Sequence, residues 1–447
     1  MPMAATRLQG ILHAMNPVPT TRIEYETYTL PNGLQVILSP HGVAPTVAVL
    51  VLYKVGSVNE PRGKTGFAHL FEHMMFQGSE NVPREMHFKY VESNGGVLNG
   101  FTSHDLTVYF ELLPASKLPL GLWLESDRMR SLQVSQENLD NQRAVVKEER
   151  RLSVDNQPYA RAMERLREIA YDNFANQHSV IGSMEDLDCA TLEDVQAFFR
   201  TYYAPNNAIL VVAGDYDPDD ARAWVARYFA DIPAQLPPPP VDVSEPDREE
   251  RREVFLDTLA QVPAVAITWK IPPRGTLEND ALQIAGDLLT DGRAARLYQR
   301  LVKQEQIAVS VSGGAEARPA PSLFRLFVLH HPHVAPTRVE AVIYEEIQKL
   351  AEGGVPEREL ERVRAQLLAQ RWSDNLYYGM QSPLGRALGL AYFAAFEGDP
   401  DGVNRALERL LAITPDEVQR AVQQYLHTSR NRTVMHIQAG ATQGGAA

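Results

Sequence analysis

A proline-rich stretch near the middle of the chain constrains how its 447 residues can fold. Five of the eight residues 233–240 are prolines, and a densely charged run follows them as far as Glu253. Prolines at this density favour an extended, semi-rigid segment, and we expect the charged run to be solvated. A chain of this length also exceeds what one hydrophobic core ordinarily supports. The sequence therefore predicts one domain over residues 1–235, a linker over 236–253 and a second domain over 254–447.

The two halves of the chain end in similar sequences. Thr191-Leu-Glu-Asp-Val-Gln196 and Thr414-Pro-Asp-Glu-Val-Gln419 each precede a helical pattern and then an apolar run that ends in Ala-Gly. Each threonine stands where a helix N-cap is expected, because acidic residues fill the turn that follows it. Duplication of a single fold is the simplest explanation of this repeat.

Both halves mix strand patterns with helix patterns. In the first half, strands are expected at 25–30, 34–38, 46–55, 97–101 and 106–111, and helices at about 66–76, 115–130, 136–154 and 160–171. Asn32-Gly33 reads as a hairpin turn. In the second half, strands at 254–259 and 264–271 precede a helix at 278–289. We therefore expect an α+β protein of two homologous domains, each a mixed or antiparallel sheet packed with helices.

Composition and charge exclude several classes of protein. The formal net charge of -13 argues against a nucleic-acid-binding surface, because phosphate binding needs a basic face. Cys189 is the only cysteine, which rules out an internal disulfide and a cysteine metal cluster. The most apolar runs, 47–53 and 387–396, are shorter than the ~18–20 residues that span a bilayer. Because the N-terminus also lacks a secretory pattern, we expect a cytoplasmic protein without a membrane anchor, with the periplasm as the alternative.

The segment His69-Leu-Phe-Glu72-His73 carries the strongest chemical signal. Histidines four apart leave one face of a helix about one turn apart, so both imidazoles can bind one ion. Glu72 lies close enough to reach a water molecule on that ion. The neighbouring residues are largely apolar, and two histidines and a glutamate in a buried helix are costly without a compensating ion. We interpret the segment as a catalytic zinc site in which Glu72 is the base.

A third protein ligand is needed, and the helix expected at 136–154 offers two adjacent candidates, Glu148 and Glu149. Glu149 shares its helical face with Gln142, Val145 and Leu152, which we interpret as an inward stripe. The face of Glu148 is polar and is expected to be solvated, with Arg151 as a partner for its charge. Helical phase therefore favours Glu149 as the ligand.

These motifs, together with the segment Leu98–Phe110, resemble the pitrilysin/insulysin (inverzincin) family of zinc metallopeptidases. The resemblance covers essentially the whole chain, and the chain's size is similar to the short branch that includes mitochondrial processing peptidase and its bacterial relatives. It implies two α/β-roll domains, one zinc ion per chain and cleavage of peptides or unfolded segments inside a chamber. It also implies roles for particular residues: zinc ligands at His69, His73 and Glu149, the base at Glu72, and substrate binding by Asn99, Gly100 and Phe101.

Two departures from the family pattern bear on activity. A glutamate that often supports the metal is replaced here by Gln142, which we expect to orient a ligand by hydrogen bonding. Val302 and Val309 occupy the places of an arginine and a tyrosine that hold the substrate in self-sufficient members. The resemblance therefore implies a heterodimer with a homologous, metal-free subunit that carries this Arg/Tyr pair, with a homodimer as the alternative.

Other sequence features are weaker. His330-His331-Pro-His333 follows an apolar strand and is interpreted as an exposed turn. Asp215–Asp220 is interpreted as the start of a helix, and the helix at 278–289 carries no ligand set, which predicts a metal-free second domain. Two alternatives to an endopeptidase stay open, namely a non-catalytic scaffold or processing-complex subunit, and a zinc carrier. The His-x-x-Glu-His set argues against the first, and a base beside the metal argues against the second.

Overall fold

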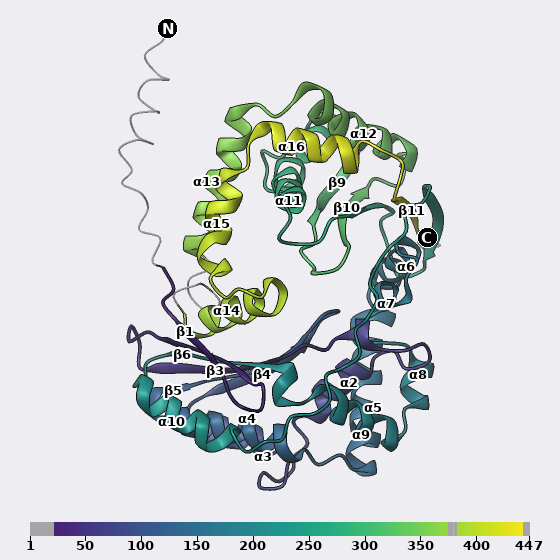
Figure 1. The fold of residues 1–447 in the computed structure, drawn as a ribbon. Coiled ribbons are helices and arrows are strands. Elements are labelled where there is room, and N and C mark those ends of the chain that lie inside the picture. The colour runs from purple at the N-terminus through teal and green to yellow at the C-terminus, as the bar shows by residue number, and fades with distance from the viewer. Residues whose placement is uncertain (1–21, 374–378, 380–381, 441–447) are drawn as a thin grey trace, which may run out of the picture.

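The computed structural model describes residues 22–373, 379 and 382–440, which form two β-sheets with helices packed around them (Figure 1). The first sheet has the strand order β1-β2-β6-β3-β5-β4. Its strands are β1 (Glu26–Thr29), β2 (Gln35–Pro40), β3 (Thr46–Tyr53), β4 (Val97–Thr102), β5 (Thr107–Pro114) and β6 (Ala208–Gly214). Asn32-Gly33 lies in the turn that joins the antiparallel strands β1 and β2, where Gly33 has a φ of 88°. The predicted turn is confirmed.

The second sheet repeats the first without its β1 strand. Its order is β7-β11-β8-β10-β9, from β7 (Arg251–Asp257), β8 (Ala264–Ile271), β9 (Ala308–Ala315), β10 (Ser322–His330) and β11 (Arg432–Ala439). The pair β2 with β6 in the first sheet and its counterpart β7 with β11 in the second are parallel. The three pairs that follow each of them in the strand order are antiparallel. The predicted α+β class and the duplication are confirmed by this shared topology.

The first half of the chain contributes nine of the labelled α-helices. They are α2 (Phe67–Met74), α3 (Met86–Ser93), α4 (Leu118–Ser131), α5 (Gln136–Arg150), α6 (Ala160–Ala170), α7 (Phe174–Gln177), α8 (Met184–Cys189), α9 (Leu192–Tyr202) and α10 (Pro218–Phe229). The second half contributes α11 (Leu277–Thr290), α12 (Pro336–Gly353), α13 (Glu357–Ser373), α14 (Pro383–Glu397), α15 (Gly402–Ala412) and α16 (Pro415–Ala421). Thr191 caps α9 and Thr414 caps α16, each in a reciprocal capping box, and Asp217 caps α10, as predicted.

Each sheet is covered on one face by a helix from the other half of the chain (Figure 1). Helix α14 packs on β3 and β6, where Leu390 joins the buried cluster of Leu50 and Val211. Helix α6 packs on β7, β8 and β11, where Leu166 is buried with Met435. The opposite face of the first sheet holds the largest cluster, which includes the buried side of α2. The two halves are therefore held together by shared apolar cores.

The segment between the halves is less solvated than predicted. Residues 234–250 contain no helix or strand, and β7 begins at Arg251, inside the predicted linker. The Glu245 side chain is buried and accepts hydrogen bonds from the backbone N–H groups of Asp172 (2.9 Å) and Asn173 (3.1 Å). Arg248 donates to the carbonyl of Ala170 at 2.7 Å. The expectation of a solvated charged run was wrong at these positions, because the run lies against α6 and α7; the domain boundary at 236–253 stays a prediction.

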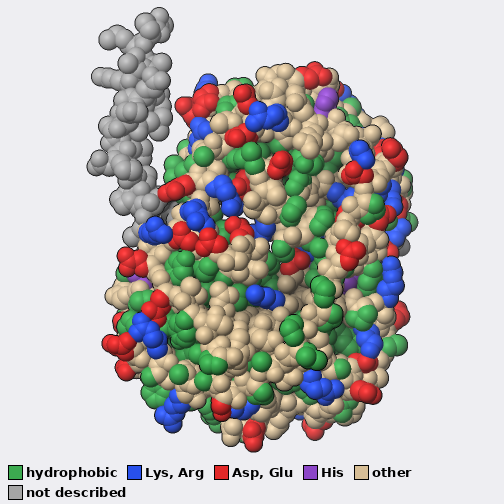
Figure 2. Space-filling model, in the orientation of Figure 1, with side chains coloured by type: hydrophobic (Ala, Val, Ile, Leu, Met, Phe, Trp, Pro, Cys, Tyr) green, Lys and Arg blue, Asp and Glu red, His purple; other side chains and the backbone are tan. Residues whose placement is uncertain are grey.

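The surface carries charges of both signs. On the face shown in Figure 2, lysine and arginine side chains are interspersed with aspartate and glutamate rather than gathered in one basic area. Within the described ranges, every helix is too short or too polar to cross a membrane.

Replacing Leu390 with alanine should test whether α14 stabilises the first sheet. Leu390→Ala should lower the free energy of unfolding by about 2–5 kcal/mol, because it removes buried methyl groups and leaves a cavity. The matched control, Leu236→Ala, removes a side chain that is 87% exposed and should change that free energy by no more than ~0.5 kcal/mol. Chemical denaturation measures both, and equal effects would contradict the packing of α14 on this sheet.

Candidate metal and substrate site

Helix α2 carries the two predicted histidines and lies between β4 and α5. It begins after Gly66, whose φ of 85° suits glycine, and it buries Phe67, Leu70 and Phe71 in the first core. The opposite side of the helix carries His69 and His73, whose ring centroids are 4.9 Å apart. The apolar residues fix the helix against the sheet, and as a consequence both imidazoles face the same side.

Glu149 on α5 completes a group of three possible metal ligands. Its Oε1 lies 3.5 Å from His69 Nε2 and its Oε2 lies 3.2 Å from His73 Nε2. Donor atoms bound to one tetrahedral zinc ion at ~2.0–2.1 Å are roughly 3.3–3.4 Å apart. Two imidazole nitrogens and one carboxylate oxygen are also a donor set that catalytic zinc commonly has. The three side chains therefore fit a zinc ion in both chemistry and spacing.

Electrostatics keep His69 and Glu149 in the protonation states that a metal needs. Burial, followed by the proximity of His73, lowers the pKa of His69 to about 4, so this imidazole is neutral at pH 7. The hydrogen bond from His73 is the main cause that lowers the pKa of Glu149 below its ordinary value, and this carboxylate is ionised. Neutral imidazole and ionised carboxylate are the forms that bind metal ions.

Glu72 lies beside the ligands and under strand β4. Its side chain is buried, and Oε2 accepts a hydrogen bond of 2.6 Å from Thr102 Oγ1. Burial raises its pKa above the ordinary value, and the hydrogen bond from Thr102 opposes that shift. A Cβ atom at Gly100 would lie only 3.3 Å from Glu72 Cγ, so the absence of a side chain there leaves room for the glutamate. Thr102 was not predicted, although its position two residues after Gly100 places both on one face of the strand.

Glu149 rather than Glu148 lies beside the two histidines, as helical phase predicts, but its surroundings differ from the prediction. Val145 is 44% exposed and Leu152 is 58% exposed, so the predicted inward stripe continues into solvent on both sides of the site. The predicted surface role of Glu148 is confirmed, because it forms an ion pair of 2.9 Å with Arg151. Gln142 is buried, and its amide donates to Asn141 Oδ1 at 2.8 Å. Its orientation of a metal ligand stays a prediction.

Strand β4 lies at the edge of the first sheet and, among the described strands, pairs with β5 alone. Its other edge is therefore not paired within the described sheet. Asn99 is exposed, and its Oδ1 accepts a hydrogen bond of 2.9 Å from the backbone of Gly100. Phe101 is half-buried against the core that α14 covers. An edge strand next to Glu72 can accept an extended peptide as an additional strand.

The turn that follows β4 is held from both halves of the chain. Backbone N–H groups of Ser57 and Val58 donate to the carbonyls of Ser103 (3.3 Å) and His104 (2.9 Å). From the second half, Arg318 donates to both carboxylate oxygens of Asp105 at 2.9 Å, and the two side chains are only 9% and 10% exposed. Nothing in the local sequence indicates this pair, because the two residues are 213 positions apart.

A second group of buried titratable side chains lies under the same sheet. His87, Glu111 and Glu125 offer three possible ligand atoms, but Arg128 forms a bidentate ion pair with Glu125 and lies 3.8 Å from Glu111. Burial lowers the pKa of His87 to about 3. The guanidinium already supplies the positive charge that these carboxylates need, which makes the group an ion-pair network rather than a metal site.

The second half of the chain contains a counterpart of α2, the two valines and the histidine cluster singled out in the sequence. Helix α11 packs on the edge strand β9, as α2 packs on β4. Helix α11 therefore corresponds to α2, the helix that carries His69 and His73. Val302 packs against the second core, and Val309 on β9 is 51% exposed. The interpretation of His330 as part of an exposed turn was wrong, because it ends β10 as a buried residue; His331 is half-buried and His333 is exposed.

Comparison with known proteins agrees with the fold and with the family resemblance. A family model described as Insulinase (Peptidase family M16) matches residues 36–183, and one described as Peptidase M16 inactive domain matches residues 190–367. The zinc protease PqqE of Helicobacter pylori is 28% identical over 432 residues, which cover 96% of this chain and 95% of that protein. The probable mitochondrial-processing peptidase subunit beta of Schizosaccharomyces pombe is 27% identical over 227 residues, 51% of this chain and 50% of that protein.

The fold is also similar to a solved structure. The crystal structure of a protease from Helicobacter pylori superposes with a TM-score of 0.87 at 27% identity and covers 93% of this chain and 100% of that chain. Two homologous α/β domains with a His-x-x-Glu-His helix in the first define a class of peptidase. The chain belongs to peptidase family M16, which confirms the resemblance found in the sequence.

Proposed function

We propose that the chain is a zinc-dependent endopeptidase subunit that cleaves peptides or unfolded polypeptide segments. The observation that carries the proposal is the convergence of His69, His73 and Glu149 beside a buried glutamate and an open strand edge. All three candidate ligands and Glu72 lie within the residues that match the insulinase model. Relatives that cover nearly the whole chain are named zinc proteases, which supports the same function.

The chain's own residues divide the chemistry among them. His69, His73 and Glu149 would hold the zinc ion, which when bound lowers the pKa of a water molecule and polarises the peptide carbonyl. Glu72 takes the proton from the attacking water and passes it to the leaving amine. Thr102 orients Glu72 by donating a hydrogen bond to one oxygen, which leaves the other oxygen free for the water.

Strand β4 would bind the substrate. A peptide added along Asn99, Gly100 and Phe101 forms main-chain hydrogen bonds that depend little on its sequence. Such a peptide would pass beside Glu72, because Gly100 lies against that side chain. This arrangement favours extended or unfolded segments over folded proteins.

A partner subunit would complete the site. The positions that carry the family's arginine and tyrosine hold Val302 and Val309, whose side chains offer no hydrogen bonds to a substrate. We infer that a homologous metal-free subunit supplies the missing pair in a heterodimer; a homodimer is the alternative. The mitochondrial relative that matches half of the chain is itself named as one subunit of a peptidase.

The alternative function is a non-catalytic scaffold of the same fold. The match of residues 190–367 to an inactive-domain model favours it for the second half. The first half retains the complete set of base and ligands, which a scaffold does not require. Zinc binding by the purified chain, together with turnover once the Arg/Tyr pair is restored, distinguishes the two functions.

Zinc binding should depend on Glu149 and not on its neighbour. Glu149→Ala should lose stoichiometric zinc, because it removes one of three ligands. Glu148→Ala is the matched control and should keep its zinc, since that side chain is 58% exposed and paired with Arg151. Elemental analysis of the purified proteins measures both. Normal zinc content in Glu149→Ala, or its loss in Glu148→Ala, would contradict the proposed ligand set.

Turnover should require Glu72 and improve when the missing pair is restored. Glu72→Gln should bind zinc normally and lower cleavage of a quenched fluorescent peptide by about 10²-fold or more, because the glutamine cannot accept the proton. Full activity of Glu72→Gln would remove this residue from the mechanism.

The double variant Val302→Arg, Val309→Tyr should raise the activity of the chain alone, because it restores the missing pair, with circular dichroism as a check of folding. A fully active wild-type chain that gains nothing from the double variant would argue against a required partner.

A further inference from the structure

The metal helix α2 begins without a cap of its own. Its N-cap residue is Gly66, which has no side chain, so the first N–H groups of the helix need acceptors from elsewhere. These groups lie one to three residues before His69. Any shift at this end of the helix therefore moves the first metal ligand directly.

Glu60 supplies the missing acceptors. Its Oε2 accepts a hydrogen bond of 2.9 Å from the Gly66 N–H, and its Oε1 accepts one of 2.7 Å from the Ala68 N–H. The side chain is fully buried. A carboxylate in this position also complements the positive end of the helix dipole. Glu60 therefore performs the role of a helix cap from a position six residues before Gly66.

His178, which directly follows α7, holds Glu60 in turn. Its Nε2 lies 3.0 Å from Glu60 Oε2, and its Nδ1 lies 2.8 Å from the carbonyl of Phe174. The Nδ1–H group donates to that carbonyl, and Nε2 shares a hydrogen bond with the Glu60 carboxyl group. Burial lowers the pKa of His178, but the hydrogen bonds and the charge of Glu60 outweigh it and the net pKa is raised. The Glu60 side chain is therefore fixed by its hydrogen bond with His178.

The segment around α8 closes the other side of the helix start. A Cβ atom at Gly66 would lie 2.5 Å from the Ile181 carbonyl oxygen, and one at Gly182 would lie 2.3 Å from that of Thr65. The Thr65 N–H donates to Asp186 at 3.0 Å. The first turn of α2 is thus confined by backbone contacts on one side and by Glu60 on the other.

We propose that Glu60 and His178 are positioning residues for the metal site, and that they fix the start of α2 so that His69 and His73 meet Glu149. The inference rests on the proposed function, because it concerns how the zinc ligands are held. Ligand atoms must lie within about 0.5 Å of their productive geometry, which a frayed helix end does not maintain. Neither residue touches the ligands themselves.

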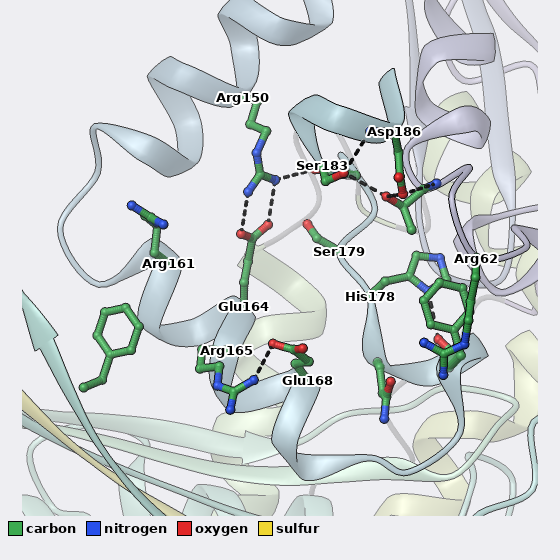
Figure 3. A pocket seen from close by; sticks show the side chains of 15 residues that line it. Arg62, Arg150, Arg161, Glu164, Arg165, Glu168, His178, Ser179, Ser183 and Asp186 are labelled. Atoms are coloured by element: carbon green, nitrogen blue, oxygen red, sulfur yellow. Dashed lines mark hydrogen bonds and ion pairs between the residues drawn. The ribbon is translucent and has the colours of Figure 1, made fainter. Parts of the chain in front are cut away.

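Loss of Glu60 should weaken zinc binding more than loss of His178. His178 lines a pocket of about 440 Å³ together with Arg62 and Asp186, and Figure 3 shows its ring directed into this group of side chains. Water can therefore replace a truncated His178. The Glu60 side chain is fully buried, and its removal leaves the Gly66 and Ala68 N–H groups without an acceptor.

The test measures zinc affinity and amide hydrogen exchange in Glu60→Ala, Glu60→Gln, His178→Ala and His178→Gln. Glu60→Ala should weaken zinc binding roughly 10–100-fold in a chelator competition, as does loss of other groups that support metal ligands. Exchange of the amides of residues 66–74 should become faster in the metal-free protein. Glu60→Gln and His178→Ala should have smaller effects, and His178→Gln, whose amide can still donate to Glu60, should recover most of the affinity.

The control is another carboxylate–histidine pair, in which only the carboxylate is buried and which belongs to the second half. Glu340 contacts His436 in the second half, and Glu340→Gln should leave zinc affinity and the exchange of residues 66–74 unchanged. Wild-type affinity in a folded Glu60→Ala variant, or an equal loss in Glu340→Gln, would overturn the inference. A chain that binds zinc but cleaves no peptide, both as the wild type and as the double variant Val302→Arg, Val309→Tyr, would contradict the proposed peptidase activity alone, because affinity and exchange are measured without turnover.

Discussion

The packing of one short helix, α2, between an edge strand and α5 determines everything else at the site. Its apolar side is buried in the first core, and its polar side carries two imidazoles and a carboxylate that would be costly to bury without partners. Glu149 faces both imidazoles from α5, while Thr102 holds Glu72 from β4. The hydrophobic core thus brings the possible ligand atoms of His69, His73 and Glu149 within 4.8 Å of one another, beside Glu72.

Duplication explains why the second half repeats the fold of the first. The two sheets share their strand order and directions, and α11 takes the place of α2. What differs is the chemistry of the side chains on that helix. The halves also exchange covering helices, α14 over the first sheet and α6 over the second, and the Asp105–Arg318 pair joins them at the turn after β4. The strand proposed to bind substrate is therefore held by both halves.

Local patterns predicted the elements that local forces determine. The helix caps at Thr191 and Thr414, the Asn32-Gly33 turn and strand 264–271 follow from neighbouring residues, and each is present. The spacing of His69, Glu72 and His73 placed three side chains correctly for the same reason. Helical phase selected Glu149 over Glu148, although it wrongly buried Val145 and Leu152, because a helix beside an open site exposes part of its apolar face.

Contacts between distant segments were beyond the reach of sequence reasoning. The cap that Glu60 provides for α2 depends on a loop conformation, and Arg318 meets Asp105 across 213 positions. The buried state of Glu245 likewise depends on where α7 lies, so composition alone suggested a solvated run. Tertiary structure decides these positions because their partners come from other elements.

An X-ray absorption spectrum of the purified, zinc-loaded chain tests the central claim most directly. A zinc ion held by His69, His73 and Glu149 should show nitrogen and oxygen neighbours at ~2.0–2.1 Å, with the outer-shell scattering of two imidazole rings. Loss of that imidazole scattering in His73→Ala would tie the signal to α2. A spectrum without imidazole scattering, or one unchanged in His73→Ala, would place the metal elsewhere and contradict the site described here.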